Sequence, residues 1–129
     1  MHTAQRILLV DDNESDNVFH EIILRKAGFK GEINVFETGV DVLDFLRSDP
    51  LEIPTYIFLD INMPMMNGFE VAQEAAPLIE GKPTVILVML TSSGSPLDRE
   101  RAASLPVISG YLTKPLTVET ALELLQRPL

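Results

Sequence analysis

The chain has 129 residues and a hydrophobic fraction of 46%, which suits a single domain with one core and leaves no room for an effector domain. Its 10 Lys and Arg against 19 Asp and Glu give a formal net charge of -9, which argues against nonspecific binding to nucleic acid or an anionic membrane surface. The lack of cysteine excludes disulfides, thiolate metal sites and cysteine nucleophiles. We therefore expect one domain, residues 1–129, in the cytoplasm, with neither nucleic acid nor membrane as a partner.

The first half of the sequence alternates two strand patterns with two helix patterns. Apolar runs at residues 6–10 and 32–37 predict strands, and residues 14–28 and 38–50 have the periodicity of helices. In the first helix, the apolar residues expected on one face are Val18, Phe19, Ile22, Ile23 and Ala27. That face is predicted to pack against the rest of the domain.

The second half continues the alternation with three strands and three helices. Strands are predicted at residues 55–60, 84–90 and 107–115, and the first two are almost continuously apolar, as in parallel strands covered on both faces. Helices are predicted at residues 67–81, 95–105 and 117–127. The helix at residues 95–105 has a thin apolar stripe, so we expect it to be the least firmly docked.

Helix starts are marked by residues that favour the N-cap position. Thr38, Ser95 and Thr117 are expected N-caps, and Asn67 is expected to open the third helix. In the last helix, the residues at helical spacing are Val118, Ala121, Leu122 and Leu125. Leu124 falls off that stripe and is predicted to be exposed.

Five strands that alternate with five helices predict an α/β fold, a doubly wound parallel sheet with right-handed crossovers. Ligands of such folds bind beyond the carboxyl ends of the strands. The polar residues at those ends are Asp11 and Asp12 after the first strand, Asp60 after the third, Thr91 and Ser92 after the fourth, and Lys114 after the fifth. The topology therefore predicts three carboxylates, hydroxyls and an ammonium at one edge of the sheet.

Such a cluster of carboxylates needs compensation. Two carboxylates about 4 Å apart repel by roughly 4 kcal/mol at an effective dielectric constant of 20. Either one acid keeps its proton or a cation lies between them, and oxygen ligands without His or Cys favour Mg²⁺. With Lys114 at the same edge, the cluster suits phosphoryl transfer, and Asp60 is the natural nucleophile, which would form an acyl phosphate.

The motifs "ILLVDDNESDN", "IFLDINMPMMNG", "VMLTSS" and "GYLTKPLT", in this order, resemble the response-regulator receiver family, the CheY-like domains. The resemblance covers essentially the whole chain and is closest to stand-alone receivers. It implies a flavodoxin-like sheet of strand order 2-1-3-4-5. It also implies that Asp60 is the phosphoacceptor, that Asp12 binds Mg²⁺ directly and Asp11 largely through water, and that the backbone carbonyl of Asn62 is a further metal ligand.

The resemblance also implies how a phosphoryl group is held and sensed. Lys114 would pair with its oxygens, Thr91 would move to hydrogen-bond one of them, and Tyr111 would be the switching aromatic residue. The Lys114–Pro115 peptide bond is expected to be cis. The implied phosphodonor is a sensor histidine kinase or a histidine phosphotransfer protein.

The output partner is expected to be a downstream protein bound through the last two helices and the strand between them, with Leu124 as a contact residue. A phosphorylation-dependent homodimer remains open.

His2 and His20 are expected to have no catalytic role, and His20 is expected to lie in solvent. Two alternatives are a Mg²⁺-dependent phosphohydrolase with an aspartyl nucleophile, which would want a second acid at Asn62, and a receiver excised from a hybrid histidine kinase. A nucleotide-binding module is disfavoured because no glycine-rich phosphate-binding motif follows any strand.

Overall fold

A computed structural model describes residues 3–127 of the chain, and His2 lies outside the described residues. The elements in chain order are β1 (Arg6–Val10), α1 (Glu14–Lys26), β2 (Glu32–Phe36), α2 (Gly39–Ser48), β3 (Thr55–Leu59), α3 (Gly68–Ile79), β4 (Val85–Thr91), α4 (Pro96–Ser104), β5 (Ile108–Thr113) and α5 (Val118–Gln126). Within this part of the chain, none of the helices has the length and hydrophobicity that crossing a bilayer requires.

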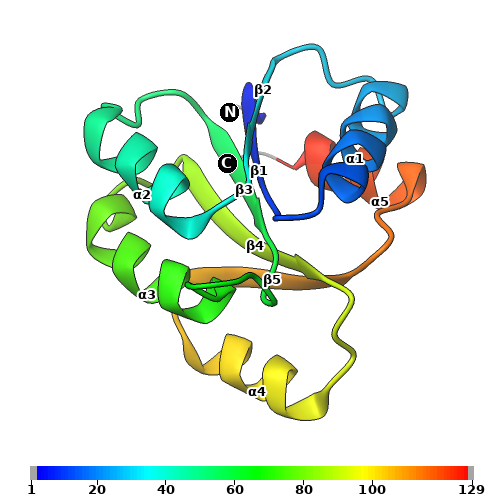
Figure 1. Ribbon diagram of the computed structural model, residues 1–129. Helices are drawn as coiled ribbons and strands as arrows, with labels where there is room; N and C mark the ends of the chain where they lie inside the picture. Colours follow the sequence, from blue (N-terminus) through cyan, green and yellow to red (C-terminus); the bar gives the residue numbers. More distant parts are fainter. Residues whose placement is uncertain (1–2, 128–129) are drawn as a thin grey trace.

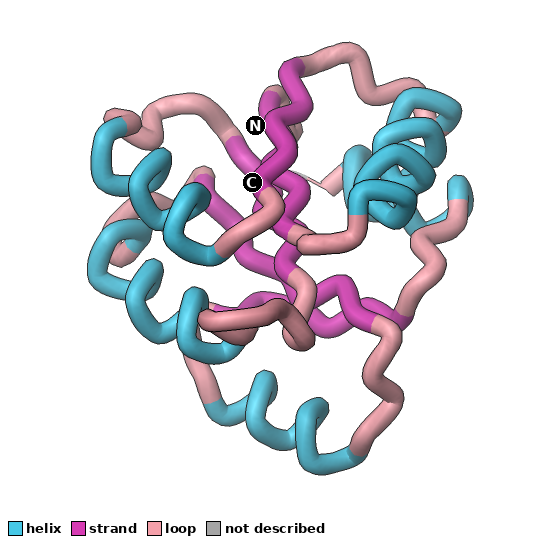
Figure 2. The backbone as a smooth tube through the Cα atoms, viewed as in Figure 1, coloured by secondary structure: helices cyan, strands magenta, loops and turns pink. Residues whose placement is uncertain are grey.

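The five strands form one parallel sheet in the order β2-β1-β3-β4-β5. Helices α1 and α5 cover one side of the sheet, and α2 and α3 cover the other, with α4 beside β5 (Figures 1 and 2). The predicted α/β class, the doubly wound topology and the strand order are thereby confirmed. The strand order reverses between β1 and β3, so the carboxyl ends of these two strands are where a ligand site is expected.

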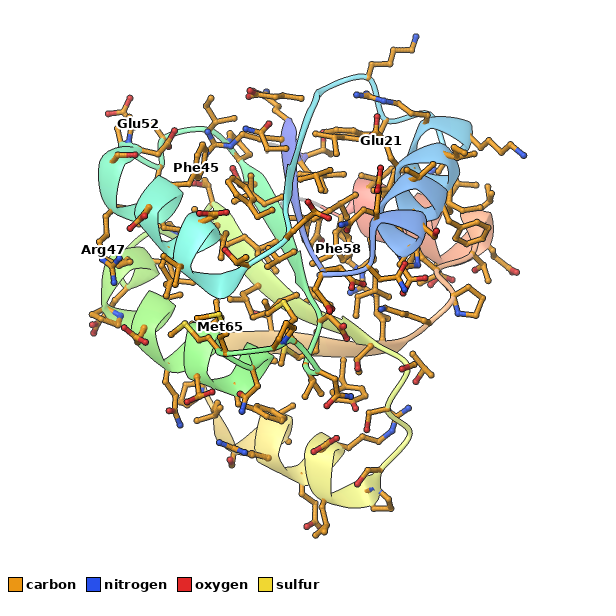
Figure 3. The ribbon with its side chains drawn as sticks, viewed as in Figure 1. Glu21, Phe45, Arg47, Glu52, Phe58 and Met65 are labelled. Atoms are coloured by element: carbon orange, nitrogen blue, oxygen red, sulfur yellow. The ribbon has the colours of Figure 1, made fainter. Side chains whose placement is uncertain are left out.

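Each side of the sheet has its own hydrophobic core. One core includes Leu59 from β3 and Phe69 from α3, and the other includes Phe58 from β3 and Leu24 from α1. Figure 3 shows Phe58 on the side of the sheet that faces α1. Alternate residues of β3 thus fill opposite cores, which explains why the strand is apolar at nearly every position.

The helix starts agree with the predicted capping residues. Thr38, Ser95 and Thr117 each accept a hydrogen bond from a backbone N–H in the first turn of their helix. Asn67 does the same in α3, where the Glu70 side chain accepts the Asn67 backbone N–H in return and completes a capping box. These local hydrogen bonds fix where each helix leaves the loop at the carboxyl end of the sheet.

The predicted apolar face of α1 is wrong for three of its five residues, whereas Ala27 is buried and Ile23 packs against the core as predicted. Val18, Phe19 and Ile22 are 54%, 43% and 48% exposed, whereas the buried residues of the helix are Asn17, His20 and Leu24. The expectation of a solvated His20 is therefore wrong as well, because its exposed fraction is 3%.

The two buried polar residues of α1 have hydrogen-bond partners outside the helix. Asn17 donates from its side-chain amide to the backbone carbonyl of Asp11 at 2.8 Å, and His20 accepts the backbone N–H of Leu116 at 3.4 Å through Nε2. Buried polar groups are tolerated when they are satisfied in this way. The helix therefore packs through a mixed face and leaves an apolar face in solvent.

Leu124 is also placed differently from its prediction. Its exposed fraction is 6%, and it packs in the same core as Phe58 and Val88, while Leu122 is 39% exposed. The exposed contact role expected for Leu124 is therefore wrong, because α5 turns Ala121 and Leu124 toward the sheet. In α4 only Ala102 is buried among the described residues, which agrees with the weak docking expected for this helix.

Candidate functional site

The carboxyl ends of the strands are joined by backbone hydrogen bonds that continue the sheet into the site. The backbone N–H of Asp60 donates to the carbonyl of Val10 at 3.0 Å, which carries β3 one residue further along β1. The backbone N–H of Lys114 donates to the carbonyl of Thr91 at 2.8 Å, which does the same for β5 and β4. Asp60, Thr91 and Lys114 are thus held at one rim by the rigid sheet.

Three carboxylates meet at this rim, as the topology predicted. Asp11, Asp12 and Asp60 each offer an oxygen that lies within 4.8 Å of the other two. Asp11 and Asp60 are buried and Asp12 is exposed. At 4.8 Å and an effective dielectric constant of 20, each pair of charges repels by about 3.5 kcal/mol or more, so the cluster attracts a cation.

The ammonium of Lys114 supplies part of that positive charge. Its Nζ atom lies 2.5 Å from Oδ2 of Asp11, 2.8 Å from Oδ2 of Asp16 and 3.6 Å from Oδ2 of Asp60. Burial lowers the pKa of Lys114, but the hydrogen bonds to Asp11 and Asp16 and the charge of Asp60 outweigh it and raise the pKa above its ordinary value. The lysine is therefore a fixed cation at neutral pH.

Asp60 has an electrostatic environment of mixed sign. Burial raises the pKa of its carboxyl group, and the neighbouring charge of Asp11 raises it further. The charge of Lys114, a hydrogen bond from Thr91 and the backbone N–H of Ile61, which donates at 2.9 Å, lower it and offset part of that rise. The net effect is an upward shift of the pKa, which comes first from burial and then from the charge of Asp11, and a metal ion beside Asp60 would oppose it.

The loop after Asp60 is folded tightly against the end of β3. The backbone N–H of Gly68 donates to the carbonyl of Ile61 at 2.8 Å, and a Cβ atom at Gly68 would collide with the carbonyl oxygen of Asp60. Only glycine therefore allows α3 to begin so close to the site. Asn62 lies exposed in this loop, and the fully exposed Met65 lies beyond it (Figure 3).

Thr91 and Tyr111 are connected through Ser93 in the loop between β4 and α4. Thr91 is fully buried, and its hydroxyl accepts the backbone N–H of Ser93 at 3.3 Å. The half-buried Tyr111 donates its hydroxyl to the backbone carbonyl of Ser93 at 2.8 Å. The guanidinium of Arg99 in α4 lies 4.7 Å from the centre of the Tyr111 ring and also donates to Thr113 at 2.9 Å. Tyr111 is thus held between the β4–α4 loop and α4.

The rim contains residues that the sequence did not point to. Asp16 contacts Lys114, Ser93 links Thr91 to Tyr111, and Arg99 covers the Tyr111 ring. For Asp16 a signal was present, since it belongs to the run of acids that follows the first strand. The Lys114–Pro115 peptide bond is cis, the isomer that the family resemblance implies.

Comparisons with known proteins agree with this fold. The family model described as "Response regulator receiver domain" matches residues 7–126. The crystal structure of a response regulator receiver protein from Dyadobacter fermentans is similar with a TM-score of 0.85 and 34% identity, covering 95% of this chain and 96% of that one.

Two curated relatives are similar in sequence. The probable methanogenesis regulatory protein FilR2 of Methanothrix harundinacea is 34% identical over 116 residues, which are 88% of this chain and 74% of the relative. The response regulator MprA of Mycobacterium avium is 33% identical over 119 residues, which are 91% of this chain, but the chain spans only 47% of that relative's length. On its fold, its motifs and the family match, the chain belongs to the response regulator receiver family of two-component signalling.

Proposed function

We propose that the chain accepts a phosphoryl group on Asp60 from a phosphohistidine of a sensor histidine kinase or a histidine phosphotransfer protein, in a Mg²⁺-dependent reaction. The observation that carries this proposal is the geometry around Asp60. Two further carboxylates lie within 4.8 Å of its own, and the Lys114 ammonium lies 3.6 Å from it. A nucleophile, a set of metal ligands and a fixed cation therefore converge on one point.

The donor set fits a hard divalent cation. Carboxylate oxygens without histidine or cysteine suit Mg²⁺, and the residues that would hold it are Asp11, Asp12, Asp60 and the backbone carbonyl of Asn62. When bound, the metal would neutralise charge on the phosphoryl oxygens. Burial and the neighbouring charge of Asp11 raise the pKa of Asp60, and a divalent cation held by these carboxylates would oppose both effects.

Asp60, Lys114 and Thr91 would then have different roles in the phosphoryl transfer. An Asp60 carboxylate oxygen forms the new bond to phosphorus while the phosphorus–nitrogen bond of the donor breaks, and the imidazole nitrogen of the donor keeps the electron pair and takes up a proton. Lys114 would bind one phosphoryl oxygen and the Thr91 hydroxyl another. Both groups already stand at the rim, since Lys114 is 3.6 Å from Asp60 and its backbone N–H donates to the carbonyl of Thr91 at 2.8 Å.

The output would arise from the contacts of Thr91. If the Thr91 hydroxyl turns to a phosphoryl oxygen, it gives up the Ser93 N–H, and Ser93 in turn holds the Tyr111 hydroxyl. Tyr111 also contacts Arg99 of α4, the helix in which only Ala102 is buried among the described residues. The surface formed by α4, β5 and α5 is therefore the proposed contact surface for a downstream protein, and a phosphorylation-dependent homodimer through it is one form of output.

The phosphodonor needs a surface next to Asp60, and the exposed apolar face of α1 suits it. Val18 and Ile22 of α1 lie with Val35 of β2 on the exterior, and Val18 and Val35 line a common surface hollow together with Glu21 and Glu37. The same helix brings Asp16 to the site. An apolar helix of the partner with flanking basic residues is complementary to this face.

We further propose that this receiver acts in the cytoplasm and catalyses only its own phosphorylation and dephosphorylation. The phosphohydrolase alternative finds no support at Asn62, where it would want an acid. The test is the intact mass of the protein after treatment with acetyl phosphate. A gain of one phosphoryl group that requires Mg²⁺ and disappears in Asp60→Asn supports the proposal.

A further inference from the structure

Asp16, in the first turn of α1, shares the ammonium of Lys114. The Nζ atom of Lys114 lies 2.8 Å from Oδ2 of Asp16, which is closer than its 3.6 Å distance from Oδ2 of Asp60. The lysine thus contacts two carboxylates, Asp11 and Asp16, more closely than it contacts the nucleophile. Nothing in the chemistry of phosphoryl transfer itself requires this third acid beside the lysine.

The position of Asp16 is fixed by hydrogen bonds that begin at the metal-binding loop. The backbone N–H of Asn13 donates to Oδ1 of Asp11 at 2.9 Å, and the Asn13 side chain accepts the backbone N–H of Asp16 at 3.0 Å. The Asn17 side chain donates to the backbone carbonyl of Asp11 at 2.8 Å. These bonds tie the first turn of α1 to Asp11, so the Asp16 carboxylate is directed at Lys114 by the fold.

We propose that Asp16 is a positioning residue that competes with the phosphoryl group for Lys114. The inference rests on the proposed function of Asp60. An ammonium has three N–H donors, and in the structure two of them are engaged by Asp11 and Asp16. A phosphoryl group on Asp60 draws Lys114, whose Nζ lies 3.6 Å from Asp60, toward itself, and the phosphoryl oxygens, Asp11 and Asp16 then compete for one positive charge.

The exposure of the two acids decides which contact opens. The Asp16 side chain is 39% exposed and that of Asp11 is 7% exposed. Released from the lysine, Asp16 is stabilised by water, whereas Asp11 would be left as a buried charge. Asp16 therefore binds Lys114 in the unphosphorylated state, and its contact with the lysine is the one that breaks on phosphorylation. The presence of Asp16 thus weakens the interaction between Lys114 and the phosphoryl group.

The test measures binding of beryllofluoride, a noncovalent mimic of a carboxylate-linked phosphoryl group, by calorimetry at saturating Mg²⁺. Asp16→Asn removes the competing charge, and the matched control Glu14→Gln removes a charge from the same turn of α1 at a residue with no side-chain hydrogen bond or ion pair in the described part of the chain. We expect Asp16→Asn to bind about threefold more tightly than wild type, the effect of one partly exposed charge pair. Glu14→Gln should change the affinity by less than about 1.5-fold.

Two further measurements distinguish the loss of the Asp16–Lys114 contact from the general loss of a negative charge. In a Lys114→Ala background, Asp16→Asn should have no larger effect than Glu14→Gln. In about 0.5 M KCl, which screens distant charges, the difference between Asp16→Asn and wild type should persist. If Lys114→Ala binds no beryllofluoride, the salt comparison alone decides.

The outcomes distinguish this inference from the proposed function. If Asp16→Asn binds beryllofluoride as Glu14→Gln does, or more weakly than wild type, or loses its gain at high salt, then Asp16 does not compete for Lys114, although Asp60 remains a phosphoacceptor. If wild type itself binds no beryllofluoride in the presence of Mg²⁺, the proposed function of Asp60 is overturned along with the inference.

Discussion

His20 in α1 accepts the backbone N–H of Leu116 through its imidazole Nε2 at 3.4 Å, across a sequence separation of 96 residues. Leu116 lies two residues after Lys114, so this hydrogen bond connects α1 to the loop that carries the lysine of the site. His20→Leu would leave the Leu116 N–H buried without a partner, and we expect a loss of about 1–3 kcal/mol in the free energy of unfolding, measured with urea. A loss no greater than that of Val40→Ala, at an exposed position of α2, would contradict this role.

The same histidine makes stability depend on pH. Burial lowers the pKa of His20, the charge of Lys114 lowers it further, and Asp16 and Asp11 oppose the shift only in part. The unfolded chain therefore binds more protons than the folded one between the lowered pKa and the ordinary value of 6.5. It follows that the stability contributed by neutral His20 is complete above that ordinary value and is lost as the pH falls toward the folded pKa.

This pH dependence can be isolated by comparison with a variant that does not titrate. The free energy of unfolding of wild type, measured from about pH 7.5 down to about pH 5.5, should fall more steeply than that of His20→Gln, which keeps a hydrogen-bond acceptor. Parallel curves for the two proteins would mean that the folded state does not disfavour the protonated imidazole.

Far from the site, the buried Arg6 and the partly buried Asp49 form an ion pair at the start of the sheet. The guanidinium donates to both carboxylate oxygens, at 3.0 and 3.1 Å, and the side-chain exposures are 3% and 20%. Asp49→Asn would leave an unpaired buried charge and should destabilise the fold by about 3 kcal/mol, the lower end of the range for such pairs. Asp44→Asn is the control, because its pair with Arg47 is exposed and should contribute less than about 0.5 kcal/mol.

The pKa of Asp49 is lowered in the folded protein, whereas burial alone raises the pKa of an acid. The hydrogen bond from Arg6 lowers the pKa of Asp49, against the effect of burial, with help from the Leu51 N–H. Its contribution is therefore complete above the ordinary value of 3.8 and is lost as the pH falls through the lower folded pKa. Equal free energies of unfolding for wild type and Asp49→Asn at neutral pH would show that the Arg6–Asp49 ion pair does not stabilise the fold.

The apolar face of α1 can be tested with two valines of equal exposure. Val18 in α1 and Val40 in α2 are each 54% exposed. Val18→Asp should slow phosphotransfer from a histidine phosphotransfer protein about tenfold or more, by placing a desolvated charge in the interface. Val40→Asp should change that rate less than about twofold, as expected for a residue outside the interface. Both variants should be labelled by acetyl phosphate as wild type is, because a small donor needs no docking surface. Equal rates for the two variants with the protein donor would place the docking surface elsewhere.

The sheet and its rim could be predicted because their signals are local. Asp11, Asp60 and Thr91 stand where an apolar run ends, and the carboxyl ends of parallel strands meet whatever the details of packing. The N-caps Thr38, Ser95 and Thr117 were predictable for a similar reason, since a cap forms its hydrogen bond within one turn.

The docked faces of α1 and α5 could not be predicted in the same way. Helix α1 carries apolar residues on more than one side, and the buried side includes Asn17 and His20, whose partners lie outside the helix, that of His20 being 96 residues away. The contact of Asp16 with Lys114 depends on that orientation and so was missed as well. Helical periodicity reports which residues share a face, but it does not report which face finds partners.

The most direct test of the central claim is the mass of the intact protein after incubation with acetyl phosphate and Mg²⁺, with Asp60→Asn and a metal-chelated sample in parallel. We expect a gain of one phosphoryl group in wild type, none in Asp60→Asn and none without the metal. An unchanged mass of folded wild type with acetyl phosphate and with a second phosphodonor, or a gain that persists in Asp60→Asn, would contradict Asp60 as the phosphoacceptor.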